Sequence, residues 1–311
     1  MDRVLADPPE LTSLYAGALA VSARAGLRRR QRPSALPLDR HRLDGLLAAP
    51  DEVEGFQRLM GRARGDFVPS GYVHILVFPV AVSVLSRPDF PLPLLGMIHL
   101  RNEIHHLRPI RLDERLAVTA WVENLTPHRS GSQVDVVVHV HSGPEMVWMG
   151  RSTYLAKGIH LTGTSDADVA TAVAADASPA AEELPGCPTA EWSLGGDTGR
   201  RYAAVSGDYN PIHLSVLSAR ALGMKRPIAH GMYLASRMVA AAGPDESTPF
   251  KWTVEFRAPV LLPSRVLLSA EVDASSTAQW RGAEVVAWDP RRRRTHFSGR
   301  LERLTVDAGA K

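Results

Sequence analysis

An almost wholly apolar stretch, residues 71–86 (GYVHILVFPVAVSVLS), constrains the fold of this 311-residue chain more than any other feature. As a helix it has no polar stripe to face water, so it must be enclosed on most of its sides. A curved antiparallel sheet wrapped around the helix meets that need, while the outer face of the sheet stays wet or paired. The stretch therefore predicts a central helix inside a curled sheet.

The same order of elements occurs twice in the chain. Four strand-like segments follow the first helix, separated by Pro, Gly or Asp turns: residues 97–108, 114–123, 132–141 and 146–155. A second helical run, residues 231–242, is followed by four more: residues 251–257, 265–273, 283–288 and 295–303. The repetition predicts a tandem duplication with an α+β fold, in which a helix followed by a meander of strands occurs twice. The two units are expected to join their edge strands into one continuous sheet.

A shift in composition separates the two copies. Residues 162–188 contain an Ala-, Asp- and Val-rich stretch and end in the sequence PGCP, a composition typical of a linker with at most one helical turn. We therefore expect a first unit at residues 1–161, a linker at 162–188 and a second unit at 189–311. The single cysteine, Cys187, lies in this linker and excludes an intramolecular disulfide framework, which favours a reducing cytoplasm.

The charge pattern narrows the classes of partner. The net charge of +3 is only mildly basic, and arginine runs at residues 28–30 and 291–294 hold much of the excess. Such runs are usually solvated loops or strand ends, although they could also attract phosphate groups. No aromatic residues are interleaved with them, so nucleic acid is not an expected partner. Residues 14–25 are rich in small apolar residues, as a signal peptide would be, but no basic leader precedes them and the stretch is too short to span a bilayer. The stretch is therefore predicted to form a short helix.

The residues that can carry chemistry are concentrated in residues 202–213, YAAVSGDYNPIH. A helix is predicted to end at Ser206-Gly207, because glycine accepts a positive φ and lets the chain turn sharply. Asn210-Pro211 then keeps the chain extended or turning, since a residue before proline avoids the α region. The sequence therefore predicts a rigid loop, in which Asn210 could orient its neighbours through its side-chain amide.

This loop presents Asp208 and His213, which are five positions apart. A carboxylate and an imidazole that converge on one small volume can hold a water molecule or a substrate hydroxyl and move its proton. The alternative is purely structural: Asp208 would cap the following turn, and His213 the helix after it.

The complete string G-D-x-N-P-x-H, from Gly207 to His213, resembles the signature of the MaoC-like or (R)-specific enoyl-CoA hydratase family. The segment AHGM at residues 229–232 resembles the start of that family's central helix. The resemblance implies a double hotdog fold and a catalytic acid/base pair of Asp208 and His213. It also implies that the Gly231 N–H binds the thioester carbonyl, with His230 beside it in the pocket.

The implied reaction is the hydration of a trans-2-enoyl thioester, or the reverse dehydration of an (R)-3-hydroxyacyl thioester, in fatty-acid metabolism. Coenzyme A or acyl carrier protein would be part of the substrate, with no metal and no redox cofactor. The alternatives within the fold are an acyl-thioesterase and a non-catalytic subunit that binds an acyl carrier. The remaining histidines, such as His105, His106, His139 and His141, are assigned to packing or to the surface.

The whole chain also resembles the longer actinobacterial 3-hydroxyacyl-thioester dehydratases, whose first hotdog is degenerate. Residues 65–71 (GDFVPSG) hold a Gly-Asp pair before the first central helix, but no Asn-Pro-x-His follows it. We therefore expect one active site per chain, in the second unit. The working particle is expected to be either a monomer that acts as a pseudo-dimer or a homodimer.

Overall fold

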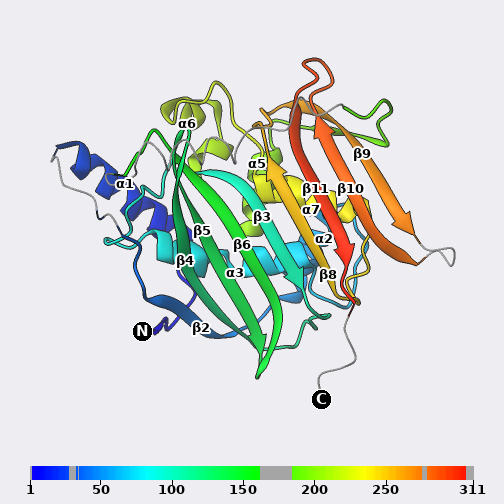
Figure 1. Ribbon diagram of the computed structural model, residues 1–311, viewed down its shortest axis with the longest axis horizontal. Helices are drawn as coiled ribbons and strands as arrows, with labels where there is room; N and C mark the ends of the chain where they lie inside the picture. The colour runs from blue at the N-terminus through cyan, green and yellow to red at the C-terminus, as the bar shows by residue number, and fades with distance from the viewer. Residues whose placement is uncertain (1, 28–32, 34, 162–183, 275–278, 306–311) are drawn as a thin grey trace.

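Both central helices lie on the same side of one sheet in the computed structural model, which describes residues 2–27, 33, 35–161, 184–274 and 279–305 (Figure 1). The helices of the first unit are α1 (Leu11–Leu27), α2 (Pro50–Leu59) and α3 (Ser70–Leu85). Its strands are β1 (Asp2–Val4), β2 (Arg40–Leu46), β3 (Ile98–His106), β4 (Leu116–His128), β5 (Gly131–Ser142) and β6 (Glu145–Lys157). Helix α3 is buried along most of its length, as its all-round apolar sequence requires.

The second unit repeats this plan around α7 (Gly231–Ala242). Three short helical segments precede α7: α5 (Thr198–Ser206), the 3-10 turn η1 (Pro211–His213) and α6 (Val216–Ala221). Its strands are β7 (Ala190–Leu194), β8 (Phe250–Phe256), β9 (Ser264–Ala274), β10 (Trp280–Trp288) and β11 (Thr295–Arg303). Two helices, each wrapped by curved antiparallel strands, make the double hotdog fold that the sequence predicts.

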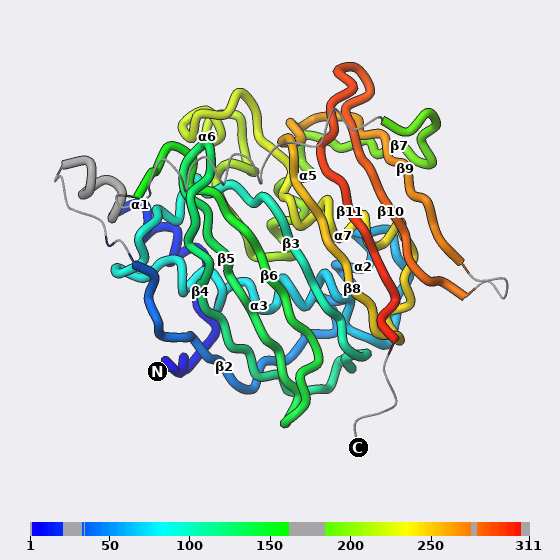
Figure 2. The backbone as a smooth tube through the Cα atoms, viewed as in Figure 1, coloured from blue at the N-terminus to red at the C-terminus, as the bar shows by residue number. Residues whose placement is uncertain are grey.

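In the described part of the chain, the two units form one 11-stranded sheet in the order β1-β2-β4-β5-β6-β3-β8-β11-β10-β9-β7. Strands β3 and β8 lie side by side at the junction (Figure 2). They pair antiparallel, and Ile104 lies opposite Trp252. This junction confirms the prediction of a continuous sheet.

The prediction of a simple meander is wrong in one respect. Strand β3 pairs with β6 and not with β4, and β8 likewise pairs with β11 and not with β9. The chain therefore crosses over after the first strand that follows each central helix. This crossover leaves β3 and β8 in the middle of the sheet, where each has a partner on both edges.

The crossover segments identify equivalent residues in the two units. Val68 N–H donates to Ile110 O at 2.8 Å in the first unit, and Ala229 N–H donates to Val260 O at 2.9 Å in the second. Each donor lies two residues before the first residue of its central helix, Ser70 or Gly231. The backbone N–H groups of Ser70 and Gly231 are therefore counterparts.

Several other predictions can be placed on the structure. Helix α1 covers the predicted N-terminal helix, and the arginines at 291–294 lie in the exposed turn between β10 and β11. Cys187 is exposed and free. The arginines at 28–30 and most of the predicted linker, residues 162–183, lie outside the described residues, so the proposed boundaries stay a prediction. Among the described helices, none combines the length and apolar character needed to cross a membrane.

Candidate active site

The loop after α5 is shaped by its own side chains. Gly207 adopts a left-handed conformation (φ 69°) and its N–H donates to Ala203 O, which ends α5 as predicted. Asp208 N–H donates to Ser206 Oγ at 3.2 Å, and Ile212 N–H donates to Asn210 Oδ1 at 3.4 Å. Pro211 opens the 3-10 turn η1, a position where its missing N–H costs no hydrogen bond. Ser206, Gly207, Asn210 and Pro211 thus build the rigid loop expected from the sequence.

Close contact with α5 fixes the His213 end of the loop. A Cβ added at Gly199 would lie 2.0 Å from the backbone oxygen of His213. Only a residue without a side chain lets the turn lie so close to the helix. Sequence reasoning missed Gly199, although a lone glycine inside a helical run is a known sign of close packing.

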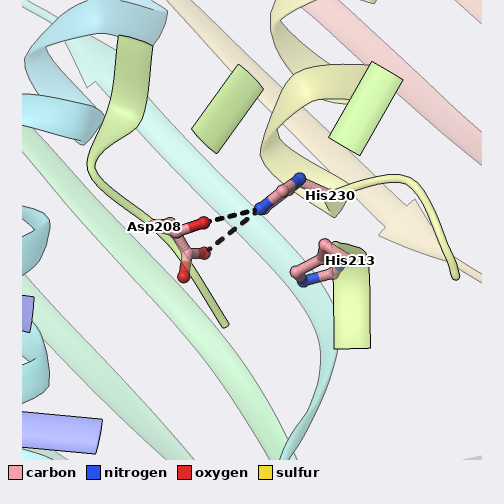
Figure 3. A group of neighbouring side chains, drawn as sticks. All are labelled: Asp208, His213 and His230. Carbon is pink, nitrogen blue, oxygen red and sulfur yellow. Dashed lines mark hydrogen bonds and ion pairs between the residues drawn. The ribbon is translucent and has the colours of Figure 1, made fainter. Parts of the chain in front are cut away.

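Asp208, His213 and His230 come together at one point (Figure 3). The potential ligand atoms of their side chains all lie within 4.8 Å of one another. The rings of His213 and His230 are stacked, with centroids 3.7 Å apart and planes 26° apart. His230 Nε2 lies 3.0 Å from the backbone oxygen of Asp208 and 3.9 Å from its Oδ2. His230 therefore contacts both members of the predicted pair.

Hydrogen bonds assign the tautomers of both rings. His213 Nδ1 lies 2.8 Å from Ile228 O, and a carbonyl can only accept, so Nδ1 carries the proton and neutral Nε2 has a free lone pair. By the same reasoning, His230 Nε2 donates to Asp208 O. Burial lowers the pKa of His213, although the Asp208 carboxylate opposes that change. Burial and the neighbouring His213 hold the pKa of His230 well below its usual value. Both rings are therefore neutral near pH 7.

The same three side chains could be considered as metal ligands. A metal site requires lone pairs that converge on one point. The lone pairs of the stacked His213 and His230 rings lie in nearly parallel planes, and one nitrogen of each ring already faces a carbonyl. This geometry suits proton transfer better than metal binding.

Gly231 opens helix α7 beside these residues. Its N–H lies in the first turn, where backbone donors have no partner within the helix, and at the positive end of the helix dipole. Gly231, Asp208 and His213 all line one cavity of about 1780 Å³. The cavity continues into the first unit, where one part of its wall is polar and another part is apolar. The apolar part includes Phe78, Val82, Leu85, Leu94 and Leu95. The cavity can therefore accept a long apolar ligand whose polar end lies at Gly231.

The structure adds one residue from the N-terminal helix. The hydroxyl of Tyr15, on α1, donates to Asp208 Oδ1 at 2.9 Å. The two residues are 193 positions apart, so no local pattern could have linked them.

Among the described residues of the first unit, no Asp and His are placed as a counterpart of the acid/base pair. Asp66, in its Gly-Asp pair, is exposed. The Ser70 N–H, the counterpart of Gly231 N–H, donates to Glu246 Oε2 at 3.1 Å, so a carboxyl group of the same chain already occupies it.

Comparison with known proteins agrees with this division. The model of the family described as MaoC like domain matches residues 185–288, which lie in the second half of the chain. Over 217 residues the chain is 33% identical to 3-hydroxyacyl-thioester dehydratase X of Mycobacterium tuberculosis, covering 69% of this chain and 74% of that protein. It is 35% identical over 79 residues to the (R)-specific enoyl-CoA hydratase of Aeromonas caviae, covering 24% of this chain and 58% of that enzyme. The crystal structure of HtdX of Mycobacterium tuberculosis matches with a TM-score of 0.69 at 27% identity, covering 85% of this chain and 100% of that one.

Proposed function

The chain belongs to the MaoC-like dehydratase family, and we propose that it is a hydro-lyase that interconverts trans-2-enoyl and (R)-3-hydroxyacyl thioesters in fatty-acid metabolism. One observation carries the assignment of the site. The Asp208 carboxylate, the His213 imidazole and the Gly231 N–H line the same cavity.

In the hydration direction, a water molecule held by Asp208 and His213 attacks C3 of the enoyl thioester. The water loses one proton, C3 gains the hydroxyl and C2 gains a proton, so the reaction needs no oxidant or reductant. The free lone pair on His213 Nε2 can accept a proton, and the low pKa of the buried ring keeps that lone pair available at neutral pH. Asp208 and His213 act as a coupled pair, and either can hold the proton in transit.

Negative charge develops on the thioester oxygen when a nucleophile adds to C3. The Gly231 N–H can donate to that oxygen, and its fixed position at the helix terminus needs no rearrangement during the reaction. A single donor of this kind typically contributes about 100- to 1000-fold to the rate.

The size of the cavity indicates the size of the acyl chain that it can hold. Its volume of about 1780 Å³ exceeds the roughly 300–1,000 Å³ usual for small-molecule pockets. We propose that the acyl chain extends from Gly231 into the apolar part that the first unit lines. Coenzyme A or acyl carrier protein would carry the thioester, with no metal or further cofactor.

An assay of purified protein with enoyl-CoA esters of several chain lengths tests this function. We expect the absorbance of the conjugated thioester to fall with time. The variants Asp208→Asn and His213→Gln should lose about 100- to 10,000-fold in kcat, the range typical of general acid/base groups. Wild-type rates in both variants, or no turnover at any chain length, would exclude the assignment.

The same reaction mixtures separate a hydratase from an acyl-thioesterase. A hydratase consumes the conjugated thioester without releasing free coenzyme A, whereas a thioesterase releases one thiol for each turnover. Stoichiometric thiol release would therefore replace the proposed function with hydrolysis.

A further inference from the structure

Helix α1 delivers a tyrosine from the start of the chain to the proposed acid/base pair. Tyr15 is only 8% exposed, and its hydroxyl lies 2.9 Å from Asp208 Oδ1. Leu11 and Tyr15 form an apolar cluster with Val82 of α3, and Phe78, Leu94 and Leu95 pack against that cluster. Packing therefore holds the hydroxyl in place, because α1 is docked on the central helix of the first unit.

The hydrogen bond from Tyr15 makes the two carboxylate oxygens of Asp208 inequivalent. Oδ1 accepts from the Tyr15 hydroxyl and from Asn210 N–H, at 2.9 and 3.2 Å. A carboxylate oxygen has two lone pairs, so these donors saturate Oδ1. The remaining oxygen, Oδ2, lies 3.9 Å from His230 Nε2. Oδ2 is thus the oxygen left to contact water or a substrate hydroxyl.

The Tyr15 hydroxyl keeps its proton over the working range of pH. Burial raises the pKa of Tyr15 far above its usual value of 10.0, and the negative charge of Asp208 raises it further. The hydroxyl can therefore donate at every pH at which the enzyme would act.

We propose that Tyr15 is a positioning residue of the active site, whose hydroxyl fixes Asp208 through Oδ1 so that Oδ2 faces the reacting water. The inference rests on the proposed function, because it assumes the acid/base role of Asp208. It gives the N-terminal helix, which lies outside both central helix-and-sheet repeats, a direct part in the chemistry of the second unit.

The variant Tyr15→Phe removes only the hydroxyl. A hydrogen bond to a charged group typically changes a rate or equilibrium constant by about 10- to 100-fold. We therefore expect kcat to fall by about that factor while KM changes little. The acid/base pair of Asp208 and His213 titrates as one unit, so loss of a donor to its deprotonated form should move the acid limb of kcat/KM to higher pH. The position of this limb does not depend on how much of the enzyme is folded, so partial unfolding cannot imitate the effect.

Tyr72→Phe is the matched control. The Tyr72 hydroxyl also donates to a carboxylate, Glu52 Oε2, at 2.8 Å, but neither residue lines the cavity. We expect this variant to keep the wild-type kcat and pH profile. In an Asp208→Asn background, Tyr15→Phe should cause little further loss, because both changes disable the same group.

Two results would overturn the inference. One is an unchanged kcat with an unchanged acid limb. The other is a rise in KM alone, which would mean that Tyr15 only lines the cavity. A different result would reject the proposed function. If Asp208→Asn stays active, the acid/base assignment is wrong, whereas an inactive Asp208→Asn beside a normal Tyr15→Phe rejects only the role of Tyr15.

Discussion

His230 joins the two residues of the sequence motif into one rigid group. Its ring stacks on His213, and its Nε2–H donates to the backbone oxygen of Asp208. The residue is only 3% exposed, so water cannot easily replace this donor. The loop carrying Asp208 is therefore held from outside as well as by its own turns.

His230→Phe separates the two contacts, because phenylalanine can stack on His213 but cannot donate to Asp208. A buried carbonyl left without a partner costs about 1–3 kcal/mol. We expect a lower melting temperature and a fall in kcat of about tenfold or more. The partly exposed His141, on β5, supplies the control His141→Phe, which should behave as wild type. A His230→Phe enzyme with normal kcat would show that stacking alone suffices.

Among single residues, the sequence predicted the site residues that lie close together in one motif. It missed those that only the tertiary structure brings to the site. Asp208 and His213 lie in one seven-residue motif, and Asn210-Pro211 within it already indicates a rigid loop. Tyr15 could not be found in this way, because its contact with Asp208 depends on how α1 docks on α3. Whether these side chains carry out catalysis stays a prediction until the variants are measured.

Among the elements, α5 sets the position of the 3-10 turn through Gly199. In Gly199→Ala, the new Cβ would overlap the His213 carbonyl, and the turn or the helix must move. We expect a loss of kcat larger than the loss of stability, because the displaced backbone belongs to His213. Steady-state kinetics and thermal unfolding measure the two effects.

Gly196→Ala is the control for this prediction. Gly196 lies three residues earlier, just before α5, and a Cβ added there meets nothing within 4 Å. It should leave kcat unchanged. Equal kinetics for the two alanine variants would contradict the role given to Gly199.

The sequence predicted the elements of the fold better than it predicted how they pair. Apolar and Ala-rich runs located both central helices, and segments bounded by Pro, Gly or Asp turns located the eight strands that follow them. Neither pattern carries information about which strand lies beside which. The crossover of β3 to β6 was therefore missed. Strand β2 was missed for a different reason: its inward-facing His41 is polar, and it is satisfied by Ser83 Oγ at 2.7 Å, so the apolar alternation of a strand is broken.

For the whole molecule, the corresponding N-terminal ends of the two central helices have different surroundings. The Ser70 N–H corresponds to the Gly231 N–H, yet it donates to Glu246 of the second unit. Trp148 and Trp252 each donate from Nε1 to Ser70 Oγ, at 3.3 and 3.0 Å, and fill the space around this helix end. The N–H at the first helix end thus contacts the second unit, whereas Gly231 at the second helix end lines the cavity.

This contact predicts a pH-dependent contribution to stability. Burial raises the pKa of Glu246 from 4.5 to about 7, so the folded protein binds its proton more tightly than the unfolded chain does. The stabilising contribution of that proton is fully present below pH 4.5 and is lost as the pH rises through 7. Glu246→Gln removes this titration and keeps an acceptor for Ser70 N–H.

The free energy of unfolding of Glu246→Gln, minus that of the wild type, should therefore increase between about pH 4.5 and 7 and then level off. The rise should be at most about 3 kcal/mol, and smaller to the extent that water reaches the carboxyl. Buried histidines such as His74 and His106, whose pKa values burial lowers to about 4, act in the opposite direction but cancel in this difference.

Denaturant unfolding at several pH values from 5 to 8 gives the measurement. The control is Glu284→Gln on β10, where the side chain is 72% exposed, and it should follow the wild type at every pH. A difference for Glu246→Gln that stays constant with pH would mean that Glu246 is ionised in the folded protein. The junction would then hold a charge at the Ser70 helix end, where the helix dipole could stabilise it.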